Sequence, residues 1–343
     1  MYLSPTEQKI KKAAENSLFY FIDGILGTEP GFDQLSPVLH LDCCTFLQNP
    51  LKKRKLMMIP RDHFKSTLLK GMVLHFLIQP KDDNCYFPGK LGTETCMLIG
   101  FDAMENATKF VSVVQHVIEH HAMFKHFWPH VRPGARWTQT VFNLERNVHF
   151  GEATLEAVSI NSPIASRHVD VFFKDDIFTF KAMIEPPTAE KTVLWHQSSI
   201  SVFRQNNYSF EIVAGTPWAQ NDVYTFIMQK QKYFDIYHRA VVENGQPIFP
   251  ERYTLEDIDQ VRQTYEGTGL FELNYMCDHS GGVLSDFKRD WFKGFKFDQS
   301  SGMIEFSPPP KPPQSPLAQA VQSAMGGLPT DMDLIQKTLK VAI

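Results

Sequence analysis

The sequence lacks several features that would place it in a special class of protein. It contains no run of about 18 apolar residues, so it predicts no transmembrane helix. The polar start of the chain (residues 1–12) has no apolar signal core, which argues against secretion. The five cysteines include no CxxC pair, so they indicate free thiols in a reducing compartment rather than a zinc site. A hydrophobic fraction of 43% and a charged fraction of 21% exclude a disordered chain.

An excess of basic charge is also missing. The chain has 34 Lys and Arg against 38 Asp and Glu, a formal net charge of −4. Overall charge therefore does not indicate a nucleic-acid-binding protein, although a local basic groove can be hidden in the sum. The basic runs at residues 52–55 and at Lys288-Arg289 are candidates for DNA contact. A solvated turn is the simpler interpretation of the first run.

Short apolar runs alternate along the chain with longer segments of helical pattern. Strands are predicted at residues 56–59, 95–100, 140–144, 147–150, 155–159, 169–174, 209–214 and 233–242. Helices are predicted at residues 66–78, 102–127, 187–203 and 255–265. This alternation predicts an α/β fold with a mostly parallel sheet that is covered on both faces. In such a sheet, ligands bind at the carboxyl ends of the strands.

The first of three polar strand ends follows the predicted strand 56–59. It reads Pro60-Arg61-Asp62-His63-Phe64-Lys65-Ser66-Thr67. A phosphate loop needs backbone N–H groups at a helix N-terminus, a lysine for the β- and γ-phosphates and a hydroxyl for Mg²⁺. Lys65 and Ser66 fit the last two roles, whereas Ile59 and Phe64 stand where the usual pattern has glycine. Taken alone, an ordinary strand–turn–helix with an exposed lysine is the better explanation.

Two further strand ends carry polar residues. The apolar run that starts at Val169 ends in Asp175-Asp176. Such a pair suits a metal–nucleotide site, because one carboxylate can hold the Mg²⁺ shell while the other polarises the attacking water. An acidic turn explains the pair equally well. The later run Gly215-Thr216-Pro217 can place a hydroxyl near a γ-phosphate, but by itself it is better explained as a simple turn.

In this order, the three runs resemble the ATPase domain of the large terminase subunits of tailed phages, the motors that pump DNA into procapsids. That family has a phosphate loop of the form P-R-x-x-x-K-S-T, an acidic strand end of Asp-Asp or Asp-Glu, and a Gly-Thr-Pro coupling motif. Trp218 and Asp222 match the Trp and the later Asp that often follow this motif. The run Ser166–Asp170 is similar to the family's G-R-H-x-D stretch, and residues 250–253, 271–275 and 290–292 resemble the end of its ATPase part. The resemblance extends over about residues 35–295.

The resemblance implies a three-layer P-loop (ASCE-type) NTPase with a mostly parallel central sheet. It divides the chain into a helical lead-in (1–50), an ATPase core (51–245), a helical subdomain or lid (246–296) and a proline-rich linker and tail (297–343). Family members usually carry an RNase H-type nuclease domain after the ATPase part, and that chemistry needs several carboxylates around two metals. The tail cannot supply them, so we expect no nuclease activity from this chain.

The resemblance also implies which residues bind ATP and Mg²⁺. The run Pro60–Thr67 holds the phosphates, with Lys65 on the β- and γ-phosphates. Ser66 and Asp175 hold Mg²⁺, and Thr67 is the less favoured hydroxyl. His40 or a nearby aromatic residue is a candidate for contact with the adenine.

The catalytic roles implied by the resemblance fall on three positions. Asp176 orients or activates the attacking water. Arg61 neutralises charge in the transition state in cis, as an arginine finger does, and Arg167 is its rival, offered in trans by a ring neighbour. A salt bridge is the equally weighted alternative for each arginine. The coupling motif, Gly215, Thr216 and Pro217, transmits hydrolysis to domain motion.

The expected function is that of an ATP-hydrolysing motor subunit which moves double-stranded DNA into a procapsid in the host cytoplasm. Its expected partners are double-stranded DNA, the portal protein, the small terminase subunit, further copies of itself in a ring, and a nuclease on a separate polypeptide, but no membrane. The alternatives are a helicase-like translocase and a nucleotide-binding assembly protein without turnover.

A zinc protease is a further alternative, because the run from His116 to His120 matches the H-x-x-E-H pattern. It would need a third ligand such as Glu185 or Glu190, and a histidine-rich surface helix is the simpler interpretation.

Overall fold

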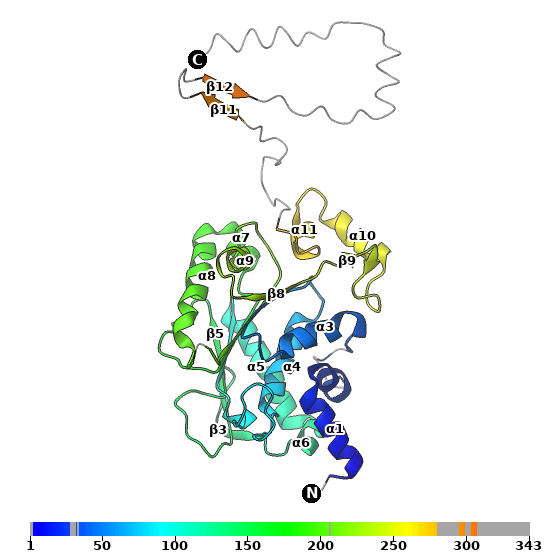
Figure 1. Cartoon of the computed structure of the whole chain (residues 1–343), viewed down its shortest axis with the longest axis vertical. Coiled ribbons are helices and arrows are strands. Elements are labelled where there is room, and N and C mark those ends of the chain that lie inside the picture. The colour runs from blue at the N-terminus through cyan, green and yellow to red at the C-terminus, as the bar shows by residue number, and fades with distance from the viewer. Residues whose placement is uncertain are drawn as a thin grey trace. The chain divides into compact units, whose positions relative to one another are not determined.

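The computed structural model describes residues 3–27, 32, 34–205 and 207–279, together with the backbone of two short strands further along the chain. The chain forms two units, Met1–Leu284 and Ser285–Ile343. In the second unit, β11 (Phe295–Asp298) pairs antiparallel with β12 (Met303–Phe306) (Figure 1). The rest of the expected proline-rich tail lies outside the described residues, as do Lys288 and Arg289.

An eight-stranded sheet forms the centre of the first unit. Its strands, in spatial order, are β3 (Pro133–Trp137), β4 (Val141–Leu144), β5 (Leu155–Ser159), β2 (Met97–Phe101), β6 (Val171–Asp175), β7 (Phe210–Gly215), β1 (Arg54–Met58) and β8 (Asp235–His238). The six strands from β5 to β8 are parallel, and β3 and β4 form an antiparallel edge. The expected α/β fold with a mostly parallel sheet is confirmed.

Helices cover both faces of this sheet (Figure 1). The first face carries α1 (Pro5–Asn16), α2 (Leu18–Tyr20), a π-helix (Phe21–Leu26), α3 (Pro37–Gln48), α4 (Lys65–Leu77), α5 (Met104–His120) and α6 (Ala122–Phe127). The second face carries α7 (Phe180–Ile184), α8 (Pro186–Ser198) and α9 (Val223–Lys230). After β8 come the hairpin β9 (Val242–Glu243)–β10 (Gln246–Pro247), α10 (Leu255–Thr264) and α11 (Leu270–Asn274).

Two hydrophobic cores follow from the alternation of side chains along the strands. On β6, Phe173 packs into the core of the first face and Phe172 into that of the second. Such strands are buried on both faces, which explains why they read as continuous apolar runs. Each large side chain buried here stabilises the fold by roughly 1.5–3 kcal/mol.

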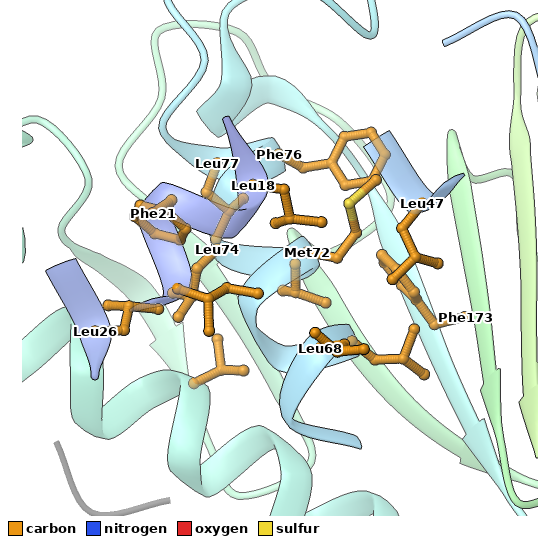
Figure 2. Close-up of a cluster of buried hydrophobic side chains, with 14 of the residues drawn as sticks. Leu18, Phe21, Leu26, Leu47, Leu68, Met72, Leu74, Phe76, Leu77 and Phe173 are labelled. Atoms are coloured by element: carbon orange, nitrogen blue, oxygen red, sulfur yellow. The ribbon is translucent and has the colours of Figure 1, made fainter. Parts of the chain in front are cut away.

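Helix α4 lies between the sheet and the N-terminal helices, and nearly all of its residues are buried. Figure 2 shows its side chains between Phe173 of the sheet and Leu18 and Phe21 of the N-terminal helices. Gly71 allows the π-helix to approach closely, because a Cβ atom there would lie 2.3 Å from Cγ1 of Ile22. Packing from two sides therefore holds α4, the helix that begins at Lys65 and follows the loop Pro60–Phe64 (the lysine loop).

Three local expectations are wrong. Residues 147–150 form no strand, and the helix expected over 102–127 breaks at His121, whose side chain caps α6. The basic run at 52–55 is not a solvated turn, because Arg54 and Lys55 are buried within β1. Arg54 pairs with Glu211 at 3.4 Å, and Lys55 donates to the carbonyl of Leu47. Burial lowers the pKa of Lys55 to about 7.

All five cysteines are free thiols, four of them buried and Cys85 half-buried. Within the described part of the chain, no helix is both long and apolar enough to cross a membrane.

Candidate active-site cleft

A cleft of about 530 Å³ opens at the carboxyl edge of the parallel strands, a volume ordinary for a small-molecule site. Its lining comes from the segments that follow four strands: Arg61, Ser66 and Lys70 after β1; Phe101, Asp102, Asn106, Lys109, Phe110 and Val113 at and after β2; Asp176, Thr179 and Phe180 after β6; and Thr216 and Trp218 after β7. The structure thus brings together members of all three polar strand ends. They meet because the carboxyl ends of parallel strands share one edge.

The order of the strands decides how these ends face each other. Strand β7 pairs with β1 on one side and with β6 on the other. The Thr216 turn therefore lies between the lysine loop and the acidic pair. A ligand that contacts both the lysine loop and the Asp175-Asp176 pair would therefore also lie next to Thr216.

The lysine loop takes a backbone conformation that glycine normally supplies. Phe64 directly precedes α4 and has a φ of 61°, and Asp62 has a φ of 60°. A residue with a Cβ atom costs roughly 1–2 kcal/mol in this left-handed region. Phe64 stands where the usual phosphate loop has glycine. The loop therefore has the left-handed backbone conformation that glycine favours, although the residue is phenylalanine.

Side-chain packing holds Phe64 in this conformation. Its ring stacks on His40 with 5.4 Å between ring centroids and lies edge-on to Phe249 at 5.3 Å. The guanidinium of Arg252 lies 4.9 Å from the Phe64 ring centroid. His40 is fully buried beneath Phe64 and does not line the cleft.

Lys65, the first residue of α4, folds back across the loop. Its Nζ donates to the carbonyl oxygens of Ile59 at 3.2 Å and Pro60 at 3.0 Å. The side chain is buried, whereas Ser66 lines the cleft. The lysine therefore closes the loop on itself, and the backbone N–H groups at the start of α4 remain beside it.

The remaining residues of the loop face away from the cleft or are covered. Asp62 is exposed, and Thr67 is buried. His63 is buried, stacks on Tyr253 at 5.2 Å and donates from Nδ1 to the carbonyl of Arg61 at 2.6 Å. Of the run Pro60–Thr67, only Arg61 and Ser66 line the cleft.

The acidic pair, Asp175 and Asp176, is incompletely hydrogen-bonded. Asp175 is buried and does not line the cleft, whereas Asp176 is half-buried and lines it. Neither carboxylate oxygen of Asp175 accepts a hydrogen bond within the described structure, and the same holds for Oδ1 of Asp176. Burial and the charge of Asp176 raise the pKa of Asp175, against the opposing effect of the nearby Ser66 hydroxyl and of Lys65 and Lys70. A buried polar atom without a partner is rare in native proteins and calls for an explanation.

Burial is also the largest cause of the pKa shift at Asp176. Burial raises its pKa, Lys65 and Arg61 lower it, and Asp102 raises it further. Together, the two carboxylates and the Ser66 hydroxyl supply the hard oxygen atoms that Mg²⁺ prefers. The unpartnered atoms of Asp175 and Asp176 therefore fit a divalent cation.

The Gly-Thr-Pro turn is fixed by packing against α9. A Cβ atom at Gly215 would lie 2.0 Å from the hydroxyl oxygen of Tyr224, so only glycine fits there. Thr216 is buried, and its Oγ1 has no hydrogen-bond partner in the described structure. Asp222, the later acid of the motif, caps α9 by accepting from the N–H of Thr225 at 2.8 Å.

The two candidate arginines lie in different places. Arg61 lines the cleft, and its guanidinium lies 5.0 Å from the ring centroid of Trp218. Arg167 precedes β6, at the opposite end of the strand from Asp176. It donates from Nε and Nη2 to Oε1 of Glu156 at 3.0 and 2.6 Å. The cleft of this chain does not include it.

Sequence reasoning did not assign Lys70 and Asp102 to the site. Lys70 lies four residues after Ser66, a spacing that puts both on one face of a helix, so the signal was present. Asp102 was expected to cap a helix, but Ala103 is the N-cap of α5. Asp102 instead accepts from Thr179 Oγ1 and Asn106 Nδ2, both at 3.1 Å. Its position directly after β2 could have indicated the cleft.

The two histidines of the H-x-x-E-H pattern lie on α5, and the zinc site that this pattern would need requires a third ligand. The rings of His116 and His120 lie 4.9 Å apart. Within the residues that the structure describes, no group of three or more His, Cys, Asp or Glu side chains could hold a metal ion.

Comparisons with known proteins yield only distant similarity. No family model matches the sequence, and no curated protein matches it. A variant of S. cerevisiae Dbp5 bound to Nup159, Gle1, IP6 and ADP is 10% identical with a TM-score of 0.33, covering 70% of this chain and 53% of that chain. This chain thus spans about half the length of that protein. The Phi-28 gp11 DNA packaging motor is 12% identical with a TM-score of 0.37, covering 74% of this chain and 76% of that one. At these TM-scores the function has to be argued from the cleft itself.

Proposed function

We propose that this chain is an ATP-hydrolysing motor subunit that translocates double-stranded DNA, as the large terminase subunits that its motifs resemble do. The observation that carries the proposal is the pair of the buried Asp175 and the half-buried Asp176, which lack full hydrogen bonding beside the Ser66 hydroxyl. Asp176 lines the same cleft as Ser66, although the two are far apart in the sequence, and Asp175 lies buried directly before Asp176 in the chain. This arrangement supports a site for a metal–triphosphate.

Phosphate binding follows from the start of α4. The free N–H groups and the positive end of the helix attract an anion. Lys65 would exchange the carbonyl oxygens of Ile59 and Pro60 for phosphate oxygens, so ligand binding opens the loop contact described above. Ser66 and Asp175 would hold Mg²⁺, which when bound neutralises phosphate charge.

Catalysis would be carried by Asp176 and Arg61. Asp176 reaches the cleft with one oxygen free of hydrogen bonds, so it can accept one from the attacking water. Its raised pKa brings the carboxylate closer to the range of an effective general base. Arg61 lies in the same cleft and can neutralise charge on the transferred phosphoryl group. Arg167 could serve such a cleft only from a neighbouring subunit.

The motor role requires partners that we propose on the resemblance alone. These are double-stranded DNA, a portal protein, a small terminase subunit and further copies of the chain in a ring. DNA gripped by its phosphates would be bound with strongly salt-dependent affinity.

A nucleotide-binding protein without turnover is the second candidate. It is favoured by one observation: Nζ of Lys65 donates to the carbonyl oxygens of Ile59 and Pro60 and so is already engaged within the loop. Such a protein would bind nucleotide without needing Asp176.

Steady-state ATP hydrolysis, with and without linear duplex DNA, tests the proposal. We expect Mg²⁺-dependent turnover that Lys65→Ala and Asp176→Asn each abolish, while Asp176→Asn still binds ADP. Nucleotide binding without turnover, with or without DNA, would favour the second candidate. If the chain neither binds nor hydrolyses the nucleotide, the assignment of the phosphate loop is refuted.

A further inference from the structure

Asn274, at the end of α11, contacts both loops of the cleft at once. Its side-chain Nδ2 donates to the carbonyl oxygen of Pro217 at 3.0 Å. Its own carbonyl oxygen accepts from the backbone N–H of Arg61 at 3.0 Å. The residue is only 1% exposed, so water does not compete for these bonds. One buried residue thus joins the lysine loop to the Gly-Thr-Pro turn.

The two loops also meet through their side chains. The guanidinium of Arg61 lies 5.0 Å from the ring centroid of Trp218, the residue after Pro217. Both side chains line the cleft. Asn274 therefore fixes the backbones on which Arg61 and Thr216 are carried, and the stacked side chains close the same connection from the cleft side.

The segment that follows Asn274 is tied to the same edge of the sheet. The N–H of Val241 donates to the carbonyl of Tyr275 at 2.8 Å, and the carbonyl of Cys277 contacts Nε2 of His238 at 2.9 Å. His279 Nε2 lies 3.2 Å from Oδ1 of Asp222, the cap of α9. Residues 274–279 thus follow the ends of β7 and β8 rather than extending into solvent.

We propose that Asn274 is a positioning residue for the hydrolysis step, setting the distance between Arg61 and the Thr216 turn. This inference rests on the proposed ATPase function. A misplacement of about 1 Å at a reacting group can lower turnover by about 100-fold, whereas ground-state binding depends mainly on the start of α4. Loss of the Asn274 amide donor should therefore affect kcat far more than nucleotide affinity.

The chain offers a matched control for this test. Asn84 is also buried, and its Nδ2 also donates to a backbone carbonyl, that of Lys90 at 2.7 Å. Asn84 does not line the cleft. Asn274→Asp and Asn84→Asp each replace one buried amide donor by a carboxyl group with almost no change in volume, so the two variants share the same added charge. A purely structural role predicts similar behaviour of the two variants.

The experiment measures kcat and KM for ATP, the Kd for ADP with Mg²⁺, and the Tm of the full chain. We expect Asn274→Asp to lower kcat by about 10- to 100-fold, with KM and Kd within about threefold of the unmodified chain. Asn84→Asp should lower Tm and leave kcat within about threefold. Equal kcat values for the two variants would overturn the inference, as would a loss in Asn274→Asp confined to KM.

Two further outcomes separate this inference from the proposed function. Turnover that survives Lys65→Ala would refute the proposed function whatever Asn274 does. If Asn274→Asp does not fold, amide hydrogen exchange on the unmodified chain decides. Saturating ADP with Mg²⁺ should then change exchange at Arg61 and over residues 270–279. A change confined to the start of α4 would overturn the inference, and failure to bind ADP would overturn the proposed function together with it.

Discussion

Replacing Phe64 by glycine should harm the protein less than replacing it by alanine. The reason is the left-handed backbone of Phe64, with a φ of 61°. Both substitutions remove the half-buried ring from His40, Phe249 and Arg252, a loss of about 2 kcal/mol, since complete burial of such a ring is worth about 3–5 kcal/mol. Alanine keeps a Cβ atom and hence the strain of about 1–2 kcal/mol.

Glycine relieves that strain but loses more chain entropy on folding, about 0.5–1 kcal/mol. The balance leaves Phe64→Gly roughly 0.5–1 kcal/mol more stable than Phe64→Ala. At a position with negative φ the order is reversed, because only the entropy difference remains. The sign of the difference between the two variants therefore reports the backbone conformation.

Phe87 provides the control. It is half-buried, its ring contacts Phe76 and Phe210, and it does not have a positive φ. Equilibrium urea unfolding of the four variants at equal m-values gives the free energies. We expect glycine to be the better substitute at 64 and alanine at 87. A glycine variant that is the worse one at both positions would refute the left-handed loop and the packing argument built on it.

Three further predictions follow from the same geometry. Asp175→Asn and Asp176→Asn should each raise Tm, because the raised pKa of each carboxyl shows that its charged form is disfavoured in the folded chain. Burial is the main cause at both positions, with the charge of Asp176 adding to it at Asp175 and that of Asp102 at Asp176. A fall in Tm in a thermal melt would contradict this. Gly215→Ala should destabilise by about 1–3 kcal/mol through contact with Tyr224, and Tyr224→Leu in the same chain should recover part of the loss in urea unfolding. Stability should fall as the pH is lowered from about 7.5 to about 5.5, by about 1 kcal/mol for each of four buried histidines, because burial lowers their pKa to about 4 and the unfolded chain binds protons first. These are His40, His63, His75 and His196. The raised pKa values of Asp175 and Asp176 act in the opposite sense, so urea midpoints are best compared in the double variant Asp175→Asn, Asp176→Asn. An unchanged or rising midpoint at the lower pH would contradict the prediction.

The sheet and the meeting of its strand ends could be predicted from the sequence because both depend on local patterns. A strand buried on both faces is a short apolar run, and polar residues after such runs fall at one edge when the strands are parallel. The burial of Arg54 and Lys55 could not be predicted in this way. Their charges are accommodated by Glu211 and by the carbonyl of Leu47, which are partners that no local pattern reveals.

The details of the cleft depend on contacts between distant segments. Asp102 could serve as a helix cap or as a cleft residue, and the placement of the distant Thr179, whose hydroxyl donates to Asp102, decides between them. The bridging role of Asn274 depends on two backbone groups more than fifty residues away along the chain, Pro217 O and Arg61 N–H. Neither can be read from residue type and spacing.

The missing glycine and the bridging asparagine have a common consequence. In a glycine-containing phosphate loop, the loop residues themselves can adopt the left-handed conformation at little cost. Here Phe249 and Arg252 hold Phe64 in that conformation, and Asn274 holds the N–H of Arg61. All three belong to the segment that follows β8. The conformation of the loop is therefore coupled to the position of that segment. If ATP opens the loop as proposed, its binding must also act on Phe249, Arg252 and Asn274.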